Sequence, residues 1–176
     1  MPTYDAREYH EVPVASSPGQ AYEAMRTVNM AKSPIVLGLV MIRGIPHFLT
    51  GKASPSRELT IDSLTEIGFV QLAEESGVEL VLGVVGRFWR LDSGLNPISA
   101  AEFASFDEAG YAKTVLNFKV LDRPGSSVLV STETRVVATD DDTRQKFLLL
   151  AFHFSGFIRT RFLAAIKRAA EAGHTD

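Results

Sequence analysis

The side chains that most often transfer protons or bind metal ions are thinly spread along this chain of 176 residues. Its four histidines are His10, His47, His153 and His174, and no two of them have the spacing of a metal-binding pair. The chain contains no cysteine, which excludes thiol nucleophiles, disulfide bonds and cysteine-bound zinc. The glycine motifs of phosphate and dinucleotide sites and the Gly-x-Ser-x-Gly elbow are also missing from the sequence. We therefore expect neither a metal site nor a cofactor.

Arg43 is the most suggestive single cation, because it follows the apolar run Ile35–Ile42 and precedes Gly44. An arginine at the end of such a helix can bind a carboxylate or phosphate over the mouth of a cavity. It can also satisfy the last carbonyl groups of the helix in solvent, and we favour this second interpretation. Glu133 and Arg135 stand two apart on one predicted strand, so we expect them in a surface charge ladder. A register shift of one residue would turn both toward the interior.

The elements that must position these residues follow the order of an α+β domain. The stretch Tyr9–Val14 is typical of a first strand, and its proline places it at the edge of a sheet. Ser17 and Gln20 form a capping-box pattern, and two short helices are predicted over Ala21–Thr27 and Ile35–Ile42. The later segments have short turns between them and predict an antiparallel meander. Its strands are expected at Phe69–Glu74, Val78–Trp89, Glu102–Phe106, Tyr111–Leu121 and Val128–Thr139.

The last two predicted strands alternate between two kinds of side chain. Leu116 and Phe118 share one face of the first strand, and Thr132 and Thr134 share one face of the second, among apolar neighbours. The opposite faces carry lysine, glutamate and arginine. This pattern predicts a sheet that is covered on one face and exposed to water on the other.

The C-terminal part of the chain has the clearest periodic signal. Asp142–Gln145 fits a capping box, and apolar residues recur at helical spacing over Phe147–Ala169. A helix of about thirty residues is about 45 Å long, so it must lie across most of a sheet. Ser155 with Gly156 allows a bend near its middle. We find no linker or repeat and expect one domain over residues 1–176.

This order of elements resembles the START-domain and birch-pollen-allergen superfamily, also called SRPBCC or helix-grip proteins. The resemblance covers nearly the whole chain and includes Tyr9–Met25, where a strand leads into a small-Pro-x-x-hydrophobic helix start. Phe103–Gly110 and Thr132–Val136 are similar to later strands of bacterial members, which include polyketide cyclase-like proteins. The resemblance implies an α+β helix-grip (START-like) fold: a curved antiparallel sheet, two short helices after the first strand, and a long C-terminal helix over the sheet. It carries no catalytic signature, so it implies no catalytic residue.

A helix lying on a curved sheet leaves part of the concave side unfilled, and such pockets are mostly apolar with a few orienting polar groups. A solid core is the alternative, but buried threonine hydroxyls would then need hydrogen-bond partners. We therefore expect a ligand-binding cavity between the sheet and the C-terminal helix. Its predicted lining residues are Trp89, Leu116, Phe118, Thr132, Thr134, Phe147, Phe154 and, at the mouth, Arg43.

These patterns favour the binding of a small hydrophobic, amphipathic or lipid-like molecule. One alternative is an enzyme of the polyketide cyclase or aromatase type, for which Tyr111, Arg43 and His47 are the nearest proton-transfer candidates, none predicted to point inward. Another is a structural or partner-binding module with a filled core. The net charge of −3 argues against a nucleic-acid partner, and the apolar stretches are shorter than the ~20 residues that span a bilayer. We expect a cytoplasmic protein without integral membrane association, and the sequence is compatible with a homodimer.

Overall fold

The computed structural model describes residues 1–30, 59–89, 94–150 and 152–173. The predicted helix Ile35–Ile42 lies outside the described residues. The elements are β1 (Ala6–Val14), α1 (Pro18–Thr27), α4 (Ile61–Leu64), a 3-10 turn (Thr65–Ile67), β2 (Val70–Glu75), β3 (Glu79–Gly86), β4 (Leu95–Asn96), α5 (Ala100–Ser105), β5 (Ala112–Arg123), β6 (Ser127–Ala138), α6 (Asp141–Leu150) and α7 (Phe152–Ala172).

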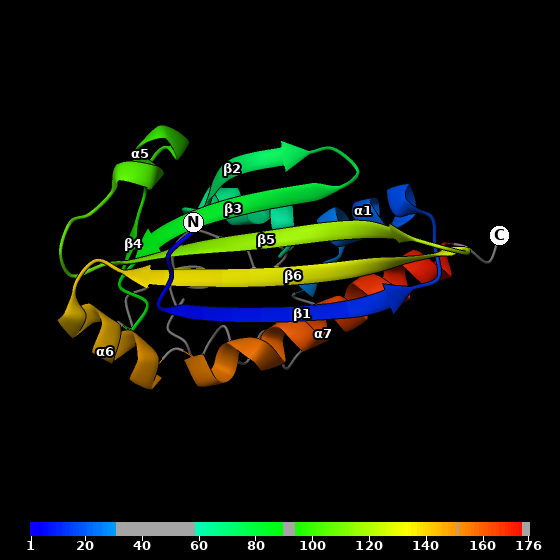
Figure 1. Cartoon of the computed structure of the whole chain (residues 1–176). Helices are drawn as coiled ribbons and strands as arrows, with labels where there is room; N and C mark the ends of the chain where they lie inside the picture. The colour runs from blue at the N-terminus through cyan, green and yellow to red at the C-terminus, as the bar shows by residue number, and fades with distance from the viewer. Residues whose placement is uncertain (31–58, 90–93, 151, 174–176) are drawn as a thin grey trace.

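One antiparallel sheet organises these elements (Figure 1). Its strands lie in the order β1-β6-β5-β3-β2, and the short β4 pairs with β3. β1 is an edge strand, as its proline predicted, and it pairs with β6 from Ala6 opposite Val136 to Val14 opposite Val128. The long hairpin of β5 and β6 turns through Gly125, whose φ of 94° is a conformation that glycine adopts without steric cost. The predicted antiparallel meander is confirmed for four of its five strands, which are β2, β3, β5 and β6.

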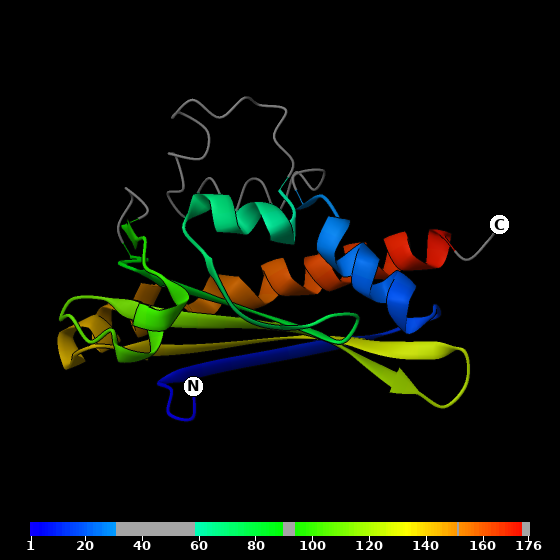
Figure 2. The same ribbon diagram turned by 90° about the horizontal axis from the view of Figure 1, so that it is seen from above.

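The two faces of the sheet are covered differently. Figure 2 shows α1, α4 and α7 together on one side of the bent sheet, which we call the concave face. α1 begins with the predicted capping box, in which the Ser17 side chain and Gln20 bond each other's backbone N–H. The short helix α5 packs on the opposite face over β3, where the ring of Phe103 lies so close to Gly83 that a Cβ there would be 2.9 Å away. The concave face therefore holds most of the buried volume.

The prediction of a strand at Glu102–Phe106 is wrong, because these residues belong to helix α5 and the turn that ends it. Ser99 caps the helix through a reciprocal box with Glu102, in which the Ser99 hydroxyl accepts from the Glu102 N–H and the carboxylate accepts from the Ser99 N–H. The two side chains also bond each other at 2.6 Å. The hydrogen bond from the Ser99 hydroxyl, and after it the one from the Ser99 backbone N–H, hold the pKa of the Glu102 carboxyl below its usual value. The capping box at Ser99 begins a helix, and the two phenylalanines of this segment are three residues apart, which is a helical spacing.

The C-terminal helical region is described as α6 and α7, which end and begin on either side of residue 151, a residue outside the described ranges. Ser155 and Gly156, where the sequence allowed a bend, lie within α7. The predicted cap at Asp142 is wrong, because the capping carboxylate is that of Asp140. It accepts from the Thr143 N–H at 2.8 Å and from the Thr143 hydroxyl at 2.9 Å.

The Asp140 carboxylate is the strongest pH-dependent feature of the described residues. Backbone hydrogen bonds from Thr143 and then Gly110 lower its pKa from 3.8 to about 2. A carboxylate with a lowered folded-state pKa contributes stability above its unfolded pKa and loses it as the pH falls through the folded value. We expect Asp140→Ala to lower the thermal midpoint at pH 7, with the gap to the wild type narrowing between about pH 4 and pH 2. Thermal unfolding followed by circular dichroism over this range measures the gap, and a constant gap would contradict the assignment.

The concave face carries two separate hydrophobic clusters. The larger one joins α1, the C-terminal half of α7 and the strand ends near Val14, Val120 and Val128. The smaller one contains Ala6, Ala112, Val136 and Phe147, with Phe88 and Trp89 packed against it. The two clusters lie at opposite ends of the strands, because the β1–β6 register places Ala6 opposite Val136 and Val14 opposite Val128. On β1 and β6 the middle of the concave face lies between them, whereas on β5 the larger cluster reaches the middle through Phe118 and Leu116.

Candidate functional site

On β1 and β6 the middle of the concave face is polar, and this part of the face is the candidate site. Alternation along β1 directs Glu8 and His10 to the same face as Val12 and Val14. The register places Glu8 opposite Thr134 and His10 opposite Thr132 of β6. We call these four residues the polar band. Polar side chains at this position separate the two hydrophobic clusters and offer hydrogen-bonding groups in an otherwise apolar interior.

Thr134 is the most informative member of the polar band. Its residue is only 5 % exposed, and its hydroxyl oxygen is buried with no hydrogen-bond partner among the described residues. Leaving a buried hydroxyl unpaired costs about 1–3 kcal/mol. Neighbouring Thr132 is 1 % exposed, so the two hydroxyl-bearing side chains are both withdrawn from bulk solvent. Within the described part of the chain, the Thr134 hydroxyl is thus an unused hydrogen-bonding group in the interior.

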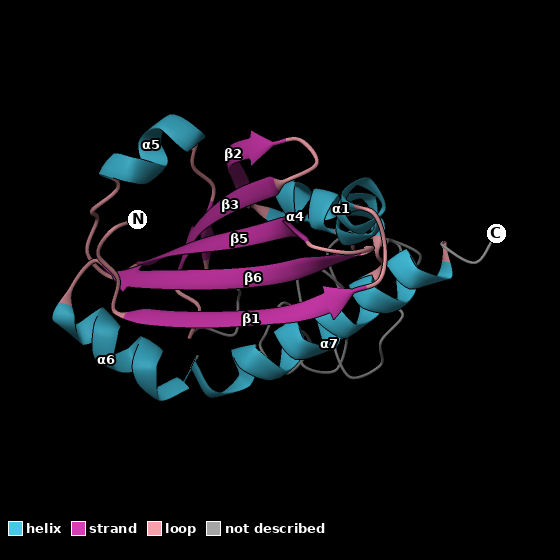
Figure 3. Cartoon of the chain, turned by 45° about the vertical axis from the view of Figure 1, so that its right-hand side comes forward, coloured by secondary structure: helices cyan, strands magenta, loops and turns pink. Residues whose placement is uncertain are grey.

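An ion pair closes over the polar band from α7. The guanidinium of Arg159 donates to the carboxylate of Glu8, and each side chain retains 15 % of its exposure. Figure 3 shows β1 and α7 running alongside each other, so this pair joins the first strand to the last helix. A desolvated ion pair stabilises a protein only when its geometry also satisfies the hydrogen bonds of both groups. The pair therefore anchors β1 to α7 and places two polar groups, which neutralise each other, at the edge of the site.

The predicted lining residues fall into three groups. Leu116 lies opposite Thr134 on β5 and is half-buried, next to the polar band. Phe118 lies opposite Thr132, is 6 % exposed and packs edge-to-face on Phe162 with ring centroids 5.6 Å apart. Phe147 and Trp89 lie in the smaller cluster at the other end of the band. Arg43 and the side chain of Phe154 lie outside the described residues.

Sequence reasoning missed Glu8, His10 and Arg159. The predicted first strand began at Tyr9, so Glu8 was left out of the alternation, and His10 was considered only as a metal ligand. The predicted strand already placed His10 on the face of Val12, and extending it by three residues to Ala6 would have placed Glu8 there too. Nothing in the sequence pairs Arg159 with Glu8, since 151 residues separate them.

The outward prediction for Glu133 and Arg135 is confirmed. Burial alone would raise the pKa of Glu133, but hydrogen bonds from Arg135 and Arg7 lower it below its usual value. The Arg7 and Arg135 Nε atoms lie 2.6 and 2.7 Å from the Glu133 Oε1, which makes the surface charge ladder that the alternation predicted. These groups lie on the face of β6 opposite to the polar band, so they take no part in the candidate site.

Of the three predicted proton-transfer candidates, Tyr111 is the one within the described residues, and its ring is stacked away from the polar band. The Arg87 guanidinium lies 4.3 Å from its ring centroid, and Phe106 meets it edge-on at 5.5 Å. Its backbone bonds the Thr139 hydroxyl at the end of the β5–β6 pair. These contacts give Tyr111 a structural role at the sheet end. His47 lies outside the described residues.

Two negative findings limit the chemistry of the described residues. Within them, no three histidine or carboxylate side chains come together as a potential metal site. Among the described helices, none has both the length and the apolar character required to cross a lipid bilayer.

This arrangement, in which one antiparallel sheet curves around a C-terminal helix, is a helix-grip fold. No protein-family model matches the chain, and no curated protein matches its sequence. Among solved structures, a norcoclaurine synthase point mutant of Thalictrum flavum, in complex with a transition-state analogue, aligns with 97 % of this chain and 96 % of its own at 9 % identity and a TM-score of 0.45. The Zhui aromatase/cyclase from Streptomyces sp. R1128 aligns with 94 % of this chain and 93 % of its own at 12 % identity and a TM-score of 0.32. A hypothetical protein of Helicobacter pylori gives 95 % and 89 % coverage, 9 % identity and a TM-score of 0.42.

Proposed function

We propose that this protein binds a small molecule with an apolar body and a hydrogen-bonding group in the interior between the sheet and α7. The single observation that carries the proposal is the buried, unpartnered hydroxyl of Thr134 within the described residues. A ligand oxygen or nitrogen there would recover the free energy that the unpaired hydroxyl costs. The ligand's apolar body would lie along Leu116 and extend toward the two hydrophobic clusters.

The predicted lining residues keep their place in this proposal. Trp89 and Phe147 form an apolar wall at one end, and Phe118 with Thr132 lies at the other. Arg43 and Phe154 remain predicted contributors. Burial of apolar surface would supply the affinity, at about 25 cal/mol per Å² before the costs of association are subtracted. Thr134 and the Glu8–Arg159 pair would orient the ligand, since a few polar groups determine the pose in a mostly apolar pocket.

Replacement of Thr134 by valine tests the proposal. Valine has nearly the same shape, so it removes the unpaired hydroxyl without opening a cavity. We expect the free energy of unfolding to stay equal or to rise by about 1 kcal/mol, while the ligand-bound fraction falls about tenfold. Native mass spectrometry of gently purified protein measures the bound fraction, and urea denaturation measures the stability.

Ser131→Ala is the matched control, because Ser131 is also buried in β6 but lies on the opposite face of the sheet. It should leave ligand retention unchanged. The proposal is contradicted if the wild-type protein carries no small molecule in native mass spectra. It is also contradicted if the Thr134→Val variant retains the small molecule fully.

A second candidate function, an enzyme of the cyclase or aromatase type, is favoured by one specific observation. His10 lies on the same face as Thr132 and Thr134, and histidine is the side chain best suited to move protons near neutral pH. An enzyme would convert its bound molecule, whereas a binding protein would release it unchanged. Mass spectrometry of the released ligand after prolonged incubation separates the two, and conversion by a cyclase that uses this histidine should be lost in His10→Gln.

We further propose that the chain acts in the cytoplasm as one domain. The lack of cysteine suits a reducing compartment, and one sheet carries the described elements.

A further inference from the structure

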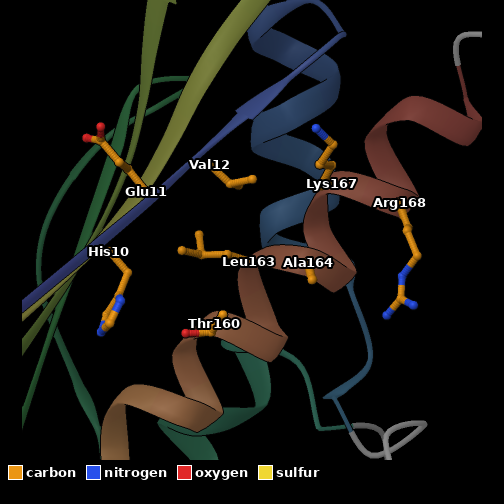
Figure 4. Close-up of a pocket in the computed structure, with 8 residues that line it drawn as sticks. All are labelled: His10, Glu11, Val12, Thr160, Leu163, Ala164, Lys167 and Arg168. Atoms are coloured by element: carbon orange, nitrogen blue, oxygen red, sulfur yellow. The ribbon is translucent and has the colours of Figure 1, made fainter.

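A groove runs along the outer seam between β1 and α7, and hydrogen-bonded contacts close the seam at both of its ends. At one end Arg159 binds Glu8. At the other end the Lys167 ammonium donates to the Pro13 carbonyl at 2.9 Å, and the Ala15 N–H donates to the carboxylate of Glu171 at 3.0 Å. Between these contacts the seam is open and encloses a groove of about 350 Å³ (Figure 4). Small-molecule pockets fall in this size range.

The floor of the groove is apolar. Val12 of β1 and Leu163 of α7 point toward each other across the seam in Figure 4, and exposed Ala164 leaves space beside them. Val12 also packs against the larger hydrophobic cluster, of which Leu163 is a member. The floor is therefore the outer side of a rigid core, which keeps the groove formed in the absence of a ligand.

The rim of the groove is cationic. Arg168 is exposed and has no ion pair within the described part of the chain, and Lys167 lies beside it on α7. Lys167 is shared between the Pro13 carbonyl and Glu171, whose carboxylate lies 3.5 Å away. The one acidic residue of the rim, Glu11, already accepts a hydrogen bond from the Tyr9 hydroxyl at 2.5 Å. An unpaired guanidinium beside an apolar floor matches a ligand with an anionic group on an apolar stem.

We infer that this groove is a second binding site, for a small amphipathic anion. The apolar part of the ligand lies on Val12, Leu163 and Ala164, and its carboxylate or sulfonate binds Arg168 with help from Lys167. The site goes beyond the proposed interior function, because its apolar floor and cationic rim lie outside the polar band and it does not need the Thr134 hydroxyl; His10 is the one residue of the polar band that also lines the groove. Its occupant is a free molecule and not a membrane surface, since the groove is concave and closed at both ends.

The test titrates the full chain with 8-anilinonaphthalene-1-sulfonate, an anionic amphipathic probe, and in parallel with its uncharged analogue N-phenyl-1-naphthylamine. Ala164→Phe fills the groove from an exposed position, so it does not disturb the core. Ala169→Phe is the matched control, because Ala169 is exposed on the same helix but does not line the groove. We expect the sulfonate to bind the wild type and the control equally and to lose about tenfold in affinity in Ala164→Phe.

Charge reversal tests the cationic rim separately. Arg168→Glu should weaken binding of the sulfonate about tenfold and leave the uncharged analogue unchanged. Arg123→Glu changes the net charge equally at an exposed position outside the groove and should have no effect. Thermal unfolding of each variant confirms that it remains folded.

The possible failures of this proposal and of the interior proposal are distinguishable. Sulfonate binding that survives Ala164→Phe and Arg168→Glu but is lost in Thr134→Val would place the probe in the interior and overturn the groove site alone. Equal affinity for the charged and uncharged probes would overturn the anion specificity. Sedimentation with phosphatidylglycerol vesicles that depends on Arg168 would overturn the free ligand in favour of a membrane surface.

Discussion

Replacement of Arg159 by methionine is expected to lower the free energy of unfolding by about 2–3 kcal/mol. The change removes the cation that neutralises Glu8 at a position where both side chains are 15 % exposed. Breaking a fully buried pair costs about 3–5 kcal/mol, and the remaining exposure of this pair reduces that figure. The loss also detaches β1 from α7 at one of the two closed ends of the seam. Urea denaturation at pH 7 measures the change.

The double variant Glu8→Leu/Arg159→Met is the control for this interpretation. It removes the isolated carboxylate together with its partner, so it should recover most of the stability that the single variant loses. A double variant whose loss equals the sum of the two single losses would show that the two side chains are not energetically coupled. Ligand retention measured in the same samples would show whether the pair also orients the bound molecule.

Truncation of Phe162 to alanine is expected to have the larger effect, a loss of about 3–5 kcal/mol. Phe162 is 4 % exposed and meets the ring of Phe118 edge-to-face, which joins α7 to the middle of the sheet. Removing the ring leaves a cavity in the larger cluster and breaks an aromatic pair worth about 0.5–1.5 kcal/mol. Phe162→Leu keeps most of the volume and should cost less than about 2 kcal/mol.

The Phe162 variants also test whether the Phe162 ring lies in a packed core or borders a cavity. A large loss means that Phe118 belongs to a packed core, and the proposed ligand would then lie beside it, along the polar band. A loss below about 1 kcal/mol would mean that Phe162 borders empty space, and the ligand cavity would then extend to Phe118 as the sequence predicted. Calorimetric unfolding of the two variants gives the answer without knowledge of the ligand.

The architecture was largely predictable because alternation and capping are local signals. The faces of β5 and β6 followed from period-two patterning, and the confirmed position of Glu133 shows that the predicted register was correct. α1 followed from the Ser17 and Gln20 pattern. α5 was missed even though Ser99 and Glu102 form the same pattern, because Glu102–Phe106 was assigned to a strand of the meander.

The candidate site was harder to predict than the fold, because it depends on contacts between distant parts of the chain. Thr132 and Thr134 were expected on the covered face, and their burial agrees with that expectation. Glu8 and His10 break the rule that inward positions are apolar, so the pattern that places a residue inward gave no reason to assign a charge there. The inward position of Glu8 is explained by its ion pair with Arg159 of α7, a contact that no local pattern in the sequence indicates.

The neighbouring positions of β1 and α7 also affect how the chain folds during synthesis. The strand leaves the ribosome early, but the helix that covers its inward face is translated more than 130 residues later. Until then the apolar face of the sheet is covered by α1 and α4 without α7, and the nascent chain presents an apolar surface that chaperones recognise. Contacts that close such a long loop raise the contact order, which slows folding. Premature termination ahead of α7 would therefore yield an aggregation-prone fragment in place of a smaller folded protein.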